Sequence, residues 1–249
     1  MNLVACVKRV PDTTSQVRPA ADGKSLDTSG ISYIVNPYDE IAVEECLKIQ
    51  EAVGGQVTIL SLGPKDSTKE LRQCLAMGAE KAVLIPDDKP NRDAFSTATI
   101  LAQALKEIDH DVIFFGRQAV DHDNAQVGLM VATLLDLPAV SEVTKVEPGD
   151  GKLTVHREAD GKTMVIEVPI PCVLTAQKGL NEPRYASLKG IMKAKKKPID
   201  EKALDLPELG LEVVEMVPPP PRPAGKIVGE GVEAVPELVR LLREEAKVL

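Results

Sequence analysis

Short apolar runs alternate with longer amphipathic stretches through the first 140 residues of the chain. Four of these runs have the length and β-branched character of buried strands, and each is followed by a helical pattern. The predicted strands are residues 3–7, 57–62, 82–86 and 112–115. Such alternation is typical of a parallel sheet whose strands are connected by crossover helices. The pattern therefore predicts an α/β fold.

The segment 36–53 shows how several local signals predict one helix. Asn36 is placed as the N-cap, Pro37 occupies the first helical position, and Gly54 follows the last turn. A buried face is predicted from apolar residues at helical spacing, namely Ala42, Cys46, Ile49 and Val53. Similar signals predict helices near 66–77 and 93–108.

After Pro138 the pattern changes to alternating residues with turn signals, which predicts hairpin strands at 140–147, 152–158 and 163–168. An apolar strand at 172–176 follows. From 179 onward regular structure is expected to be sparse, with a proline-rich stretch at 217–225 and an amphipathic helix at 232–247.

The proline-rich stretch has two interpretations. It is either a linker or an arm that reaches across a partner subunit, because the final helix carries an apolar face that has to pack on something. The predicted organisation is a nucleotide-binding α/β domain at 1–178, a partner-recognition loop and basic segment at 179–200, and an extended arm with its helix at 201–249.

Composition excludes several classes of protein. A formal charge of −8 argues against a general nucleic-acid binder, which needs a basic face. Four cysteines without a CxxC pair indicate buried thiols in a reducing compartment. The chain has neither a signal-peptide pattern nor 18 consecutive apolar residues, so we expect a cytoplasmic protein that does not insert into a membrane.

The stretch GRQAVDHDNAQVG at 116–128 follows the fourth predicted strand and lies at its carboxyl end, where ligands bind in open α/β sheets. Asp123 is predicted as the N-cap of the next helix, with Gln126 completing a capping box. The free N–H groups of residues 124–127 would then favour an anion, and Gly128 would let the backbone approach it. The stretch therefore predicts a nucleotide site.

The same stretch has a plainer interpretation, in which Asp121, Asp123 and Asn124 only cap a helix and solvate a loop. A metal site is not supported, because the three histidines lack HxxxH or HxxE spacing. The GxSxG and GxxxxGK[ST] patterns are also missing from the sequence, as is a GxGxxG turn after the first strand. No catalytic residue is predicted, and we expect a protein that is not an enzyme.

Several longer motifs resemble the beta subunit of electron transfer flavoprotein, and they occur in the same order: CVKRV at 6–10, NPYDEIAVEE at 36–45, LAMGAEKA at 75–82, the stretch at 116–128, and LNEPRYASLKGIMKAKKKPI at 180–199. The resemblance covers essentially the whole chain. It implies a Rossmann-like, parallel-sheet adenine-nucleotide-binding sandwich, of the adenine nucleotide alpha hydrolase type. It also implies a heterodimer in which the alpha subunit carries the redox-active FAD while the beta subunit holds a structural AMP.

The partners implied by the resemblance are acyl-CoA and other flavin dehydrogenases, which donate electrons, and an electron transfer flavoprotein-quinone oxidoreductase. Eukaryotic members of the family act in the mitochondrial matrix. Carried over by position, the AMP site of the family falls on three strand ends and one helix start. The implied cofactor-binding residues are Cys6, Asn36, Pro37, Tyr38, Asp39, Leu62, Gly116, Arg117, Gln118, Ala119, Val120, Asp121, His122, Asp123, Asn124, Ala125, Gln126 and Val127. Tyr38 matches an aromatic residue that approaches the FAD of the alpha subunit.

A docking segment is implied as well, because Leu188 matches a leucine that inserts into a hydrophobic pocket of the dehydrogenase. The implied docking residues are Tyr185, Leu188, Ile191, Lys193 and Lys196. Six basic residues lie within 184–197, a stretch without Asp or Glu. They are either a solvated surface or a patch that steers an acidic partner, and the resemblance favours steering.

This chain departs from the family pattern in two places: an acidic triplet is DHD at 121–123, and Leu62 stands in place of a cysteine. Members that hold a second FAD instead of AMP often show Gly-Asp-Thr in this loop and a proline shortly after QVG. Here HDN at 122–124 and Leu129 favour AMP. A second FAD stays open as an alternative, as does a free-standing adenine-nucleotide-binding domain, although that class should show a Ser-Gly-Gly turn where this chain has CVKRVPD.

Overall fold

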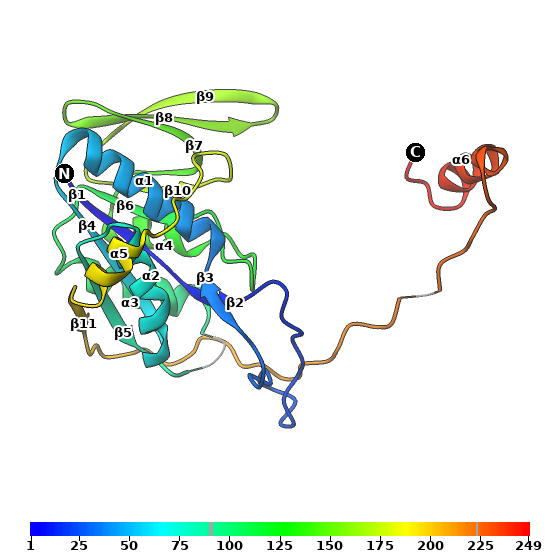
Figure 1. Cartoon of the computed structure of the whole chain (residues 1–249), viewed down its shortest axis with the longest axis horizontal. Coiled ribbons are helices and arrows are strands. Elements are labelled where there is room, and N and C mark those ends of the chain that lie inside the picture. The colour runs from blue at the N-terminus through cyan, green and yellow to red at the C-terminus, as the bar shows by residue number, and fades with distance from the viewer. Residues whose placement is uncertain (90–91, 223) are drawn as a thin grey trace. The chain divides into compact units, whose positions relative to one another are not determined.

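The computed structural model describes residues 1–89, 92–222 and 224–249, and the chain divides into two compact units, Met1–Met216 and Val217–Leu249. Within the described residues, the first unit is built on a nine-stranded sheet in the order β11-β5-β4-β1-β6-β10-β7-β8-β9 (Figure 1). Its strands are β1 Asn2–Cys6, β4 Gln56–Gly63, β5 Lys81–Pro86, β6 Val112–Gly116, β7 Ala139–Pro148, β8 Lys152–Ala159, β9 Lys162–Pro169, β10 Cys172–Ala176 and β11 Ile199–Glu201.

Neighbouring strands from β11 to β7 are all parallel, and β8 and β9 continue the sheet as an antiparallel extension. The predicted α/β class and the predicted hairpin strands are therefore confirmed. The sequence did not indicate that β10 would insert between β6 and β7, because the partners of a parallel strand are set by the whole sheet and not by neighbouring residues.

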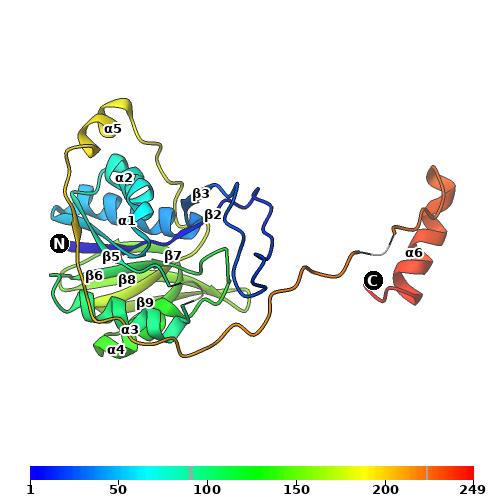
Figure 2. The same cartoon turned by 90° about the horizontal axis from the view of Figure 1, so that it is seen from below.

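Helices cover both faces of the sheet. They are α1 Pro37–Val53, α2 Thr68–Met77, α3 Ala94–Leu105, α4 Val127–Leu135 and α5 Leu188–Ala194, with a 3₁₀ turn η1 at Lys65–Ser67. Figure 2 shows α1, α2 and α5 on one side and α3 and α4 on the other. Each face has its own buried apolar cluster, so the unit has three layers.

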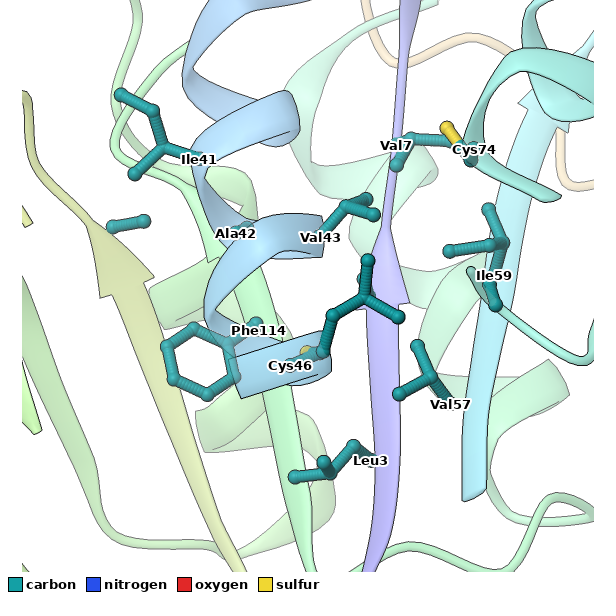
Figure 3. Close-up of a cluster of buried hydrophobic side chains, with 14 of the residues drawn as sticks. Leu3, Val7, Ile41, Ala42, Val43, Cys46, Val57, Ile59, Cys74 and Phe114 are labelled. Carbon is teal, nitrogen blue, oxygen red and sulfur yellow. The ribbon is translucent and has the colours of Figure 1, made fainter. Parts of the chain in front are cut away.

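The core between α1 and the sheet is drawn in Figure 3, where Ala42, Val43 and Cys46 of the helix lie over Leu3 and Phe114 of the strands. Fully burying a side chain such as Leu or Phe contributes about 1.5–3 kcal/mol. All four cysteines are buried and free, which confirms the expectation of buried thiols.

The prediction that Val53 belongs to the buried face of α1 was wrong, since this residue is 49% exposed. At 17 residues the helix is about 25 Å long, whereas the five residues of β1 span about 17 Å. The last turn of α1 therefore extends past the strand that the rest of the helix covers.

Short elements beyond the predicted ones were missed. The strands β2 (Arg9–Pro11) and β3 (Tyr33–Val35) pair with each other across an intervening excursion of the chain. Regular structure also continues past 179, where α5 and β11 form. Three-residue strands carry no measurable periodicity, and the lysines of α5 mask its apolar positions.

In the second unit, α6 (Val235–Glu244) follows a 3₁₀ turn η2 at Val232–Ala234. The final helix was correctly predicted but ends before 247, since Lys247 has a φ of 53°. Leu241 is buried within the unit, whereas Val235 and Leu238 are exposed.

Candidate functional site

Three neighbouring parallel strands have their carboxyl ends side by side: β4 ends at Gly63, β1 at Cys6 and β6 at Gly116. From β1 the chain proceeds through β4 and β5 on one side and then returns to β6 on the other. The boundary between β1 and β6 is therefore a topological switch point, outside which open α/β sheets bind ligands. The predicted site residues Cys6, Leu62 and Gly116 lie at these strand ends.

The first turn of α1 packs directly on the end of β6. A Cβ atom added to Gly116 would lie 2.7 Å from the carbonyl carbon of Tyr38 and would overlap the carboxylate of Asp39. Only glycine allows this approach, so the position is fixed by packing between two protein segments.

Asp39 is buried, and its carboxylate bridges the two strand ends. Oδ2 accepts the backbone N–H of Lys8 at 2.7 Å, and Oδ1 accepts that of Gly116 at 3.1 Å. Burial raises the pKa of Asp39 to about 7, while its hydrogen bonds, including those from the two N–H groups, oppose that rise. The carboxylate thus serves to join β1 to β6 at the switch point.

Asn36 begins α1 as predicted, but its side chain does not cap the helix. Instead Nδ2 donates to the carbonyl of Gln118 at 2.8 Å, and Oδ1 accepts the N–H of Val120 at 3.1 Å. This fully buried amide therefore holds the loop 116–126 against the start of α1.

The predicted capping box at Asp123 and Gln126 was wrong. Helix α4 begins at Val127, with Gln126 as its N-cap, and the side chain of Asp123 accepts from Gln118 Nε2 at 2.6 Å. Asp123 and Ala125 have φ values of 52° and 51°. Two left-handed residues postpone the helix by one turn, so its free N–H groups begin at Val127 and not at 124.

The approach of Gly128 to a ligand stays a prediction, and the glycine also has a packing role that the sequence did not indicate. A Cβ atom there would lie 3.1 Å from side-chain atoms of both Phe115 and Thr175. The glycine therefore brings α4 close to β6 and β10, and its small size serves packing of the helix on the sheet.

A charged cluster lies over the loop. The Lys8 ammonium is 2.6 Å from Asp121 Oδ2 and 3.3 Å from His122 Nδ1. Burial acts to raise the pKa of Asp121, but hydrogen bonds from His122 and Lys8 and the Lys8 charge lower it to about 2. Asp121 is thus ionised at neutral pH. Lys8 was not among the predicted site residues, although its position just after the first strand could have indicated it.

Arg117 is half-buried at the other side of the loop. Its Nε lies 3.9 Å from Glu142 Oε1, too far for a hydrogen bond, and within the described part of the chain this buried nitrogen has no hydrogen-bond partner. The loop residues 121–126 are exposed. Two cations, Lys8 beside Asp121 and Arg117 beside Glu142, and the N-terminus of α4 thus lie near the exposed loop, and a helix N-terminus favours an anion.

Tyr38 faces a different space. It lines a pocket of about 400 Å³ together with residues of β7, β8 and the segment after β10, namely Glu142, Thr144, Glu158, Gln177, Lys178 and Gly179. Sequence reasoning found Tyr38 but none of the other lining residues. They come from β7, β8 and the segment after β10, which the sequence did not place beside the start of α1.

The predicted docking residues lie just before, on and just after α5, on the outer side of the α1–α2 layer (Figure 2). Tyr185 is fully exposed, Leu188 is 84% exposed and Ile191 is 43% exposed, and Lys193 and Lys196 are also exposed. Two members of the basic run are not free surface charges. Arg184 pairs with Glu44, and Lys197 donates to three backbone carbonyls, so both side chains hold the segment in place.

Over residues 1–89, 92–222 and 224–249, no cluster of three His, Cys, Asp or Glu side chains could hold a metal ion. Nor does the part of the chain that the structure describes contain a helix long and apolar enough to cross a membrane.

Comparison with known proteins gives a consistent result. The sequence profile described as "Electron transfer flavoprotein domain" matches residues 24–207. Electron transfer flavoprotein subunit beta of Bacillus subtilis is 40% identical over an alignment of 259 positions, which covers all of both chains. The mitochondrial beta subunit of Oryza sativa subsp. indica is 39% identical, again over the full length of both. The Caffeyl-CoA reductase-Etf complex subunit CarD of Acetobacterium woodii is 40% identical over 80% of this chain and 77% of its own.

Proposed function

The chain belongs to the electron transfer flavoprotein family, in which its full-length relatives are beta subunits, and on this premise we propose a function in three parts. It binds AMP at the switch point of its sheet, completes the FAD site of an alpha subunit, and docks flavin dehydrogenases that donate electrons. The heterodimer then passes electrons to a quinone oxidoreductase of the respiratory chain. We place it in the cytoplasm of a prokaryote.

The observation that carries the AMP assignment is the Nε of Arg117, which has no hydrogen-bond partner among the described residues, lies 3.9 Å from Glu142 Oε1 and stands beside an exposed loop and the N-terminus of α4. A buried guanidinium nitrogen without a partner is costly, and a ligand oxygen would remove that cost. Lys8, paired with Asp121 of the loop, is a second cation in this region. We assign the phosphate of AMP to these groups and its adenine to the ends of β1 and β4, near Cys6 and Leu62.

The FAD contribution rests on Tyr38 and its pocket. Tyr38 stands on the first turn of α1, which Gly116 and Asp39 fix against β6. The backbone of Tyr38 is therefore fixed, and its side chain lines a space of about 400 Å³ that opens to the surface. We assign this space to the flavin end of the FAD that the alpha subunit carries. The flavin supplies the redox chemistry, and this chain supplies the wall that orients it.

The docking assignment rests on α5. Large apolar side chains such as Leu188 that are almost wholly exposed, next to exposed lysines, fit an anchor surrounded by steering charges. The matching surface on the dehydrogenase should be an apolar pocket with acidic residues around it.

The decisive experiment is the cofactor content of the heterodimer, purified after co-expression with its alpha subunit and then denatured. One FAD and one AMP per heterodimer, separated by chromatography, would support the proposal. Two FAD would support the alternative in which a second FAD occupies the nucleotide site. A stable monomer that retains adenine nucleotide without any alpha subunit would instead support a free-standing nucleotide-binding domain.

A further inference from the structure

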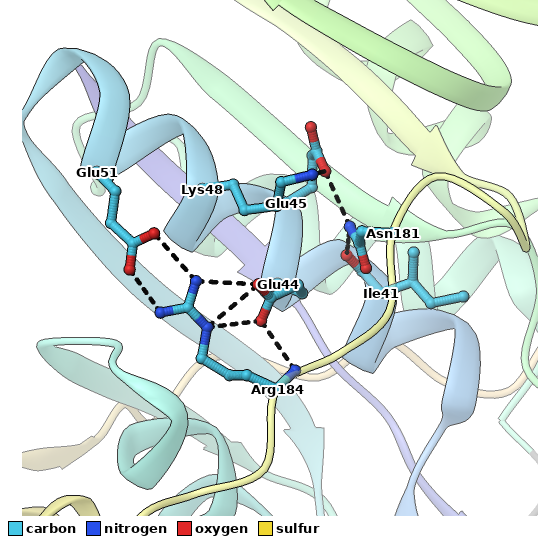
Figure 4. A network of polar contacts seen from close by, with 7 residues as sticks. All are labelled: Ile41, Glu44, Glu45, Lys48, Glu51, Asn181 and Arg184. Atoms are coloured by element: carbon cyan, nitrogen blue, oxygen red, sulfur yellow. Dashed lines mark hydrogen bonds and ion pairs between the residues drawn. The ribbon is translucent and has the colours of Figure 1, made fainter.

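The segment that leads from β10 to α5 is fastened to α1 by one arginine. Arg184 Nε and Nη2 donate to both carboxylate oxygens of Glu44 over 2.8–3.1 Å, and the backbone N–H of Arg184 donates to Glu44 Oε2 at 3.1 Å (Figure 4). Nη1 and Nη2 donate to Glu51, two turns further along α1, at 2.5 and 3.1 Å. The guanidinium thus uses its planar fork on two carboxylates at once.

A second contact fixes the segment three residues earlier. Asn181 Nδ2 donates to the carbonyl of Ile41 at 3.0 Å and to Glu45 Oε2 at 2.9 Å (Figure 4). Ile41 and Glu45 are one turn apart on α1, so the chain between 181 and 184 follows the helix surface. The docking residue Tyr185 comes directly after this fastening.

The other end of the docking segment is fastened to α2. Lys197 Nζ donates to the carbonyls of Leu75, Gly78 and Ala79 at 2.5–3.1 Å, where α2 ends, and Arg72 Nη1 donates back to the carbonyls of Ala194 and Lys197 at 2.5 Å. Lys197 therefore satisfies carbonyls at the end of α2, and Arg72 satisfies carbonyls at and just after the end of α5, which these helix ends would otherwise leave free. The exposed residues of α5 lie between these two attachments.

Charge and exposure separate the roles of these basic residues. The Glu44 side chain is only 6% exposed, so its charge needs the pairing that Arg184 provides, whereas Lys193 on α5 and Lys196 just after it are exposed. Hydrogen bonding to Arg184 lowers the pKa of Glu51, so this pair stays ionised at neutral pH.

We propose that Arg184 is the positioning residue of the docking surface: its bidentate contacts with Glu44 and Glu51 fix on α1 the start of the segment that presents Leu188 to a flavin dehydrogenase. The inference rests on the proposed docking function. A surface that is ordered before the partner arrives avoids the entropic cost of ordering its long side chains on binding. Arg184 itself need not touch the partner.

Arg184→Lys tests this, because it keeps the positive charge but loses the fork that reaches two carboxylates. In the full heterodimer we expect the KM for reduction by a dehydrogenase to rise about tenfold, which corresponds to about 1.4 kcal/mol. The kcat should stay within about twofold, as should the slope of rate against salt, because the electron-transfer centre and the net charge are unchanged. The FAD spectrum and the rate of reduction by dithionite should match wild type.

Two further variants make the result decisive if Arg184→Lys does not fold. Glu51→Gln removes only the exposed half of the contact and should raise KM by about threefold. Arg18→Lys makes the same substitution at an exposed arginine, which donates to Gln16 two residues away, and should change nothing.

Leu188→Ala separates failure of this inference from failure of the docking function. If Leu188→Ala raises KM but Arg184→Lys and Glu51→Gln do not, the docking function stands and the positioning role is overturned. If Leu188→Ala has no effect either, the docking function itself is wrong, and the inference falls with it. A lower kcat with unchanged KM in Arg184→Lys would also overturn the positioning role.

Discussion

Asp39 accepts the backbone N–H of Gly116 at 3.1 Å, and this bond ties the first turn of α1 to the end of β6. The two residues are 77 positions apart in the chain. Because Asp39 also accepts the N–H of Lys8, one carboxylate links the two strands at whose ends we propose the nucleotide site. Tyr38 is carried on the same turn, so the proposed AMP and FAD contacts share one support.

The first prediction concerns the stability that Asp39 provides. Asp39→Ala leaves the N–H groups of Lys8 and Gly116 without their acceptor in a buried place, and each such loss costs about 1–3 kcal/mol. We expect the free energy of unfolding, measured by urea titration at pH 6, to fall by about 2 kcal/mol or more. Asp27→Ala, at an exposed turn, is the control and should cost less than half of that. Equal losses in the two variants would contradict the bridging role.

The second prediction concerns pH. Since burial raises the pKa of Asp39 to about 7, the folded chain binds more protons than the unfolded chain between about pH 4 and 7. The stabilising contribution of the group is complete below the unfolded pKa and is lost as pH rises through 7. The stability difference between wild type and Asp39→Ala should therefore shrink from pH 6 to pH 8. A difference that stays constant from pH 6 to pH 8 would show that Asp39 is ionised in both states throughout this range.

The third prediction concerns the loop 116–126. Asn36→Ala removes both side-chain bonds to Gln118 and Val120, so the loop loses its attachment to α1. We expect the AMP content of the purified heterodimer, measured by chromatography after denaturation, to fall by at least half. Asn2→Ala, at an exposed asparagine, should leave it unchanged. Full AMP retention in Asn36→Ala would place the nucleotide elsewhere.

The fourth prediction separates the anchor from the steering charges on α5. Truncating a buried anchor typically costs about 2 kcal/mol or more, mainly in dissociation, so Leu188→Ala should lower electron transfer from the dehydrogenase at least about tenfold at every salt concentration. Lys193→Ala combined with Lys196→Ala should slow association at low salt only. Screening shortens the reach of these charges to about 3 Å at 1 M salt, where the double variant should match wild type.

Stopped-flow reduction of the heterodimer across ionic strength measures both effects. A rate for Leu188→Ala equal to wild type throughout would mean that α5 is an ordinary surface helix. A salt-independent defect in the lysine variant would assign these residues to direct contact and not to steering.

The sequence by itself determined the class of fold and most elements. Apolar runs of strand length located β1, β4, β5, β6 and β10, and Asn36 with Pro37 and Gly54 located both ends of α1. These signals are local, because a strand or helix buries a face whose period is written in a few consecutive residues. Motif order along the chain was enough to indicate the family, which the comparisons confirm.

Only the tertiary structure decided what the polar side chains do. The pattern made Asp123 a helix cap and Arg184 a member of an exposed basic run, whereas the fold pairs Asp123 with Gln118 and Arg184 with Glu44 and Glu51. Asp39 meets Gly116 77 positions away, and Arg184 meets Glu44 140 positions away. A buried polar group has to find its hydrogen-bond partner wherever the packed layers bring one, and that partner is fixed by topology and not by neighbours in the sequence.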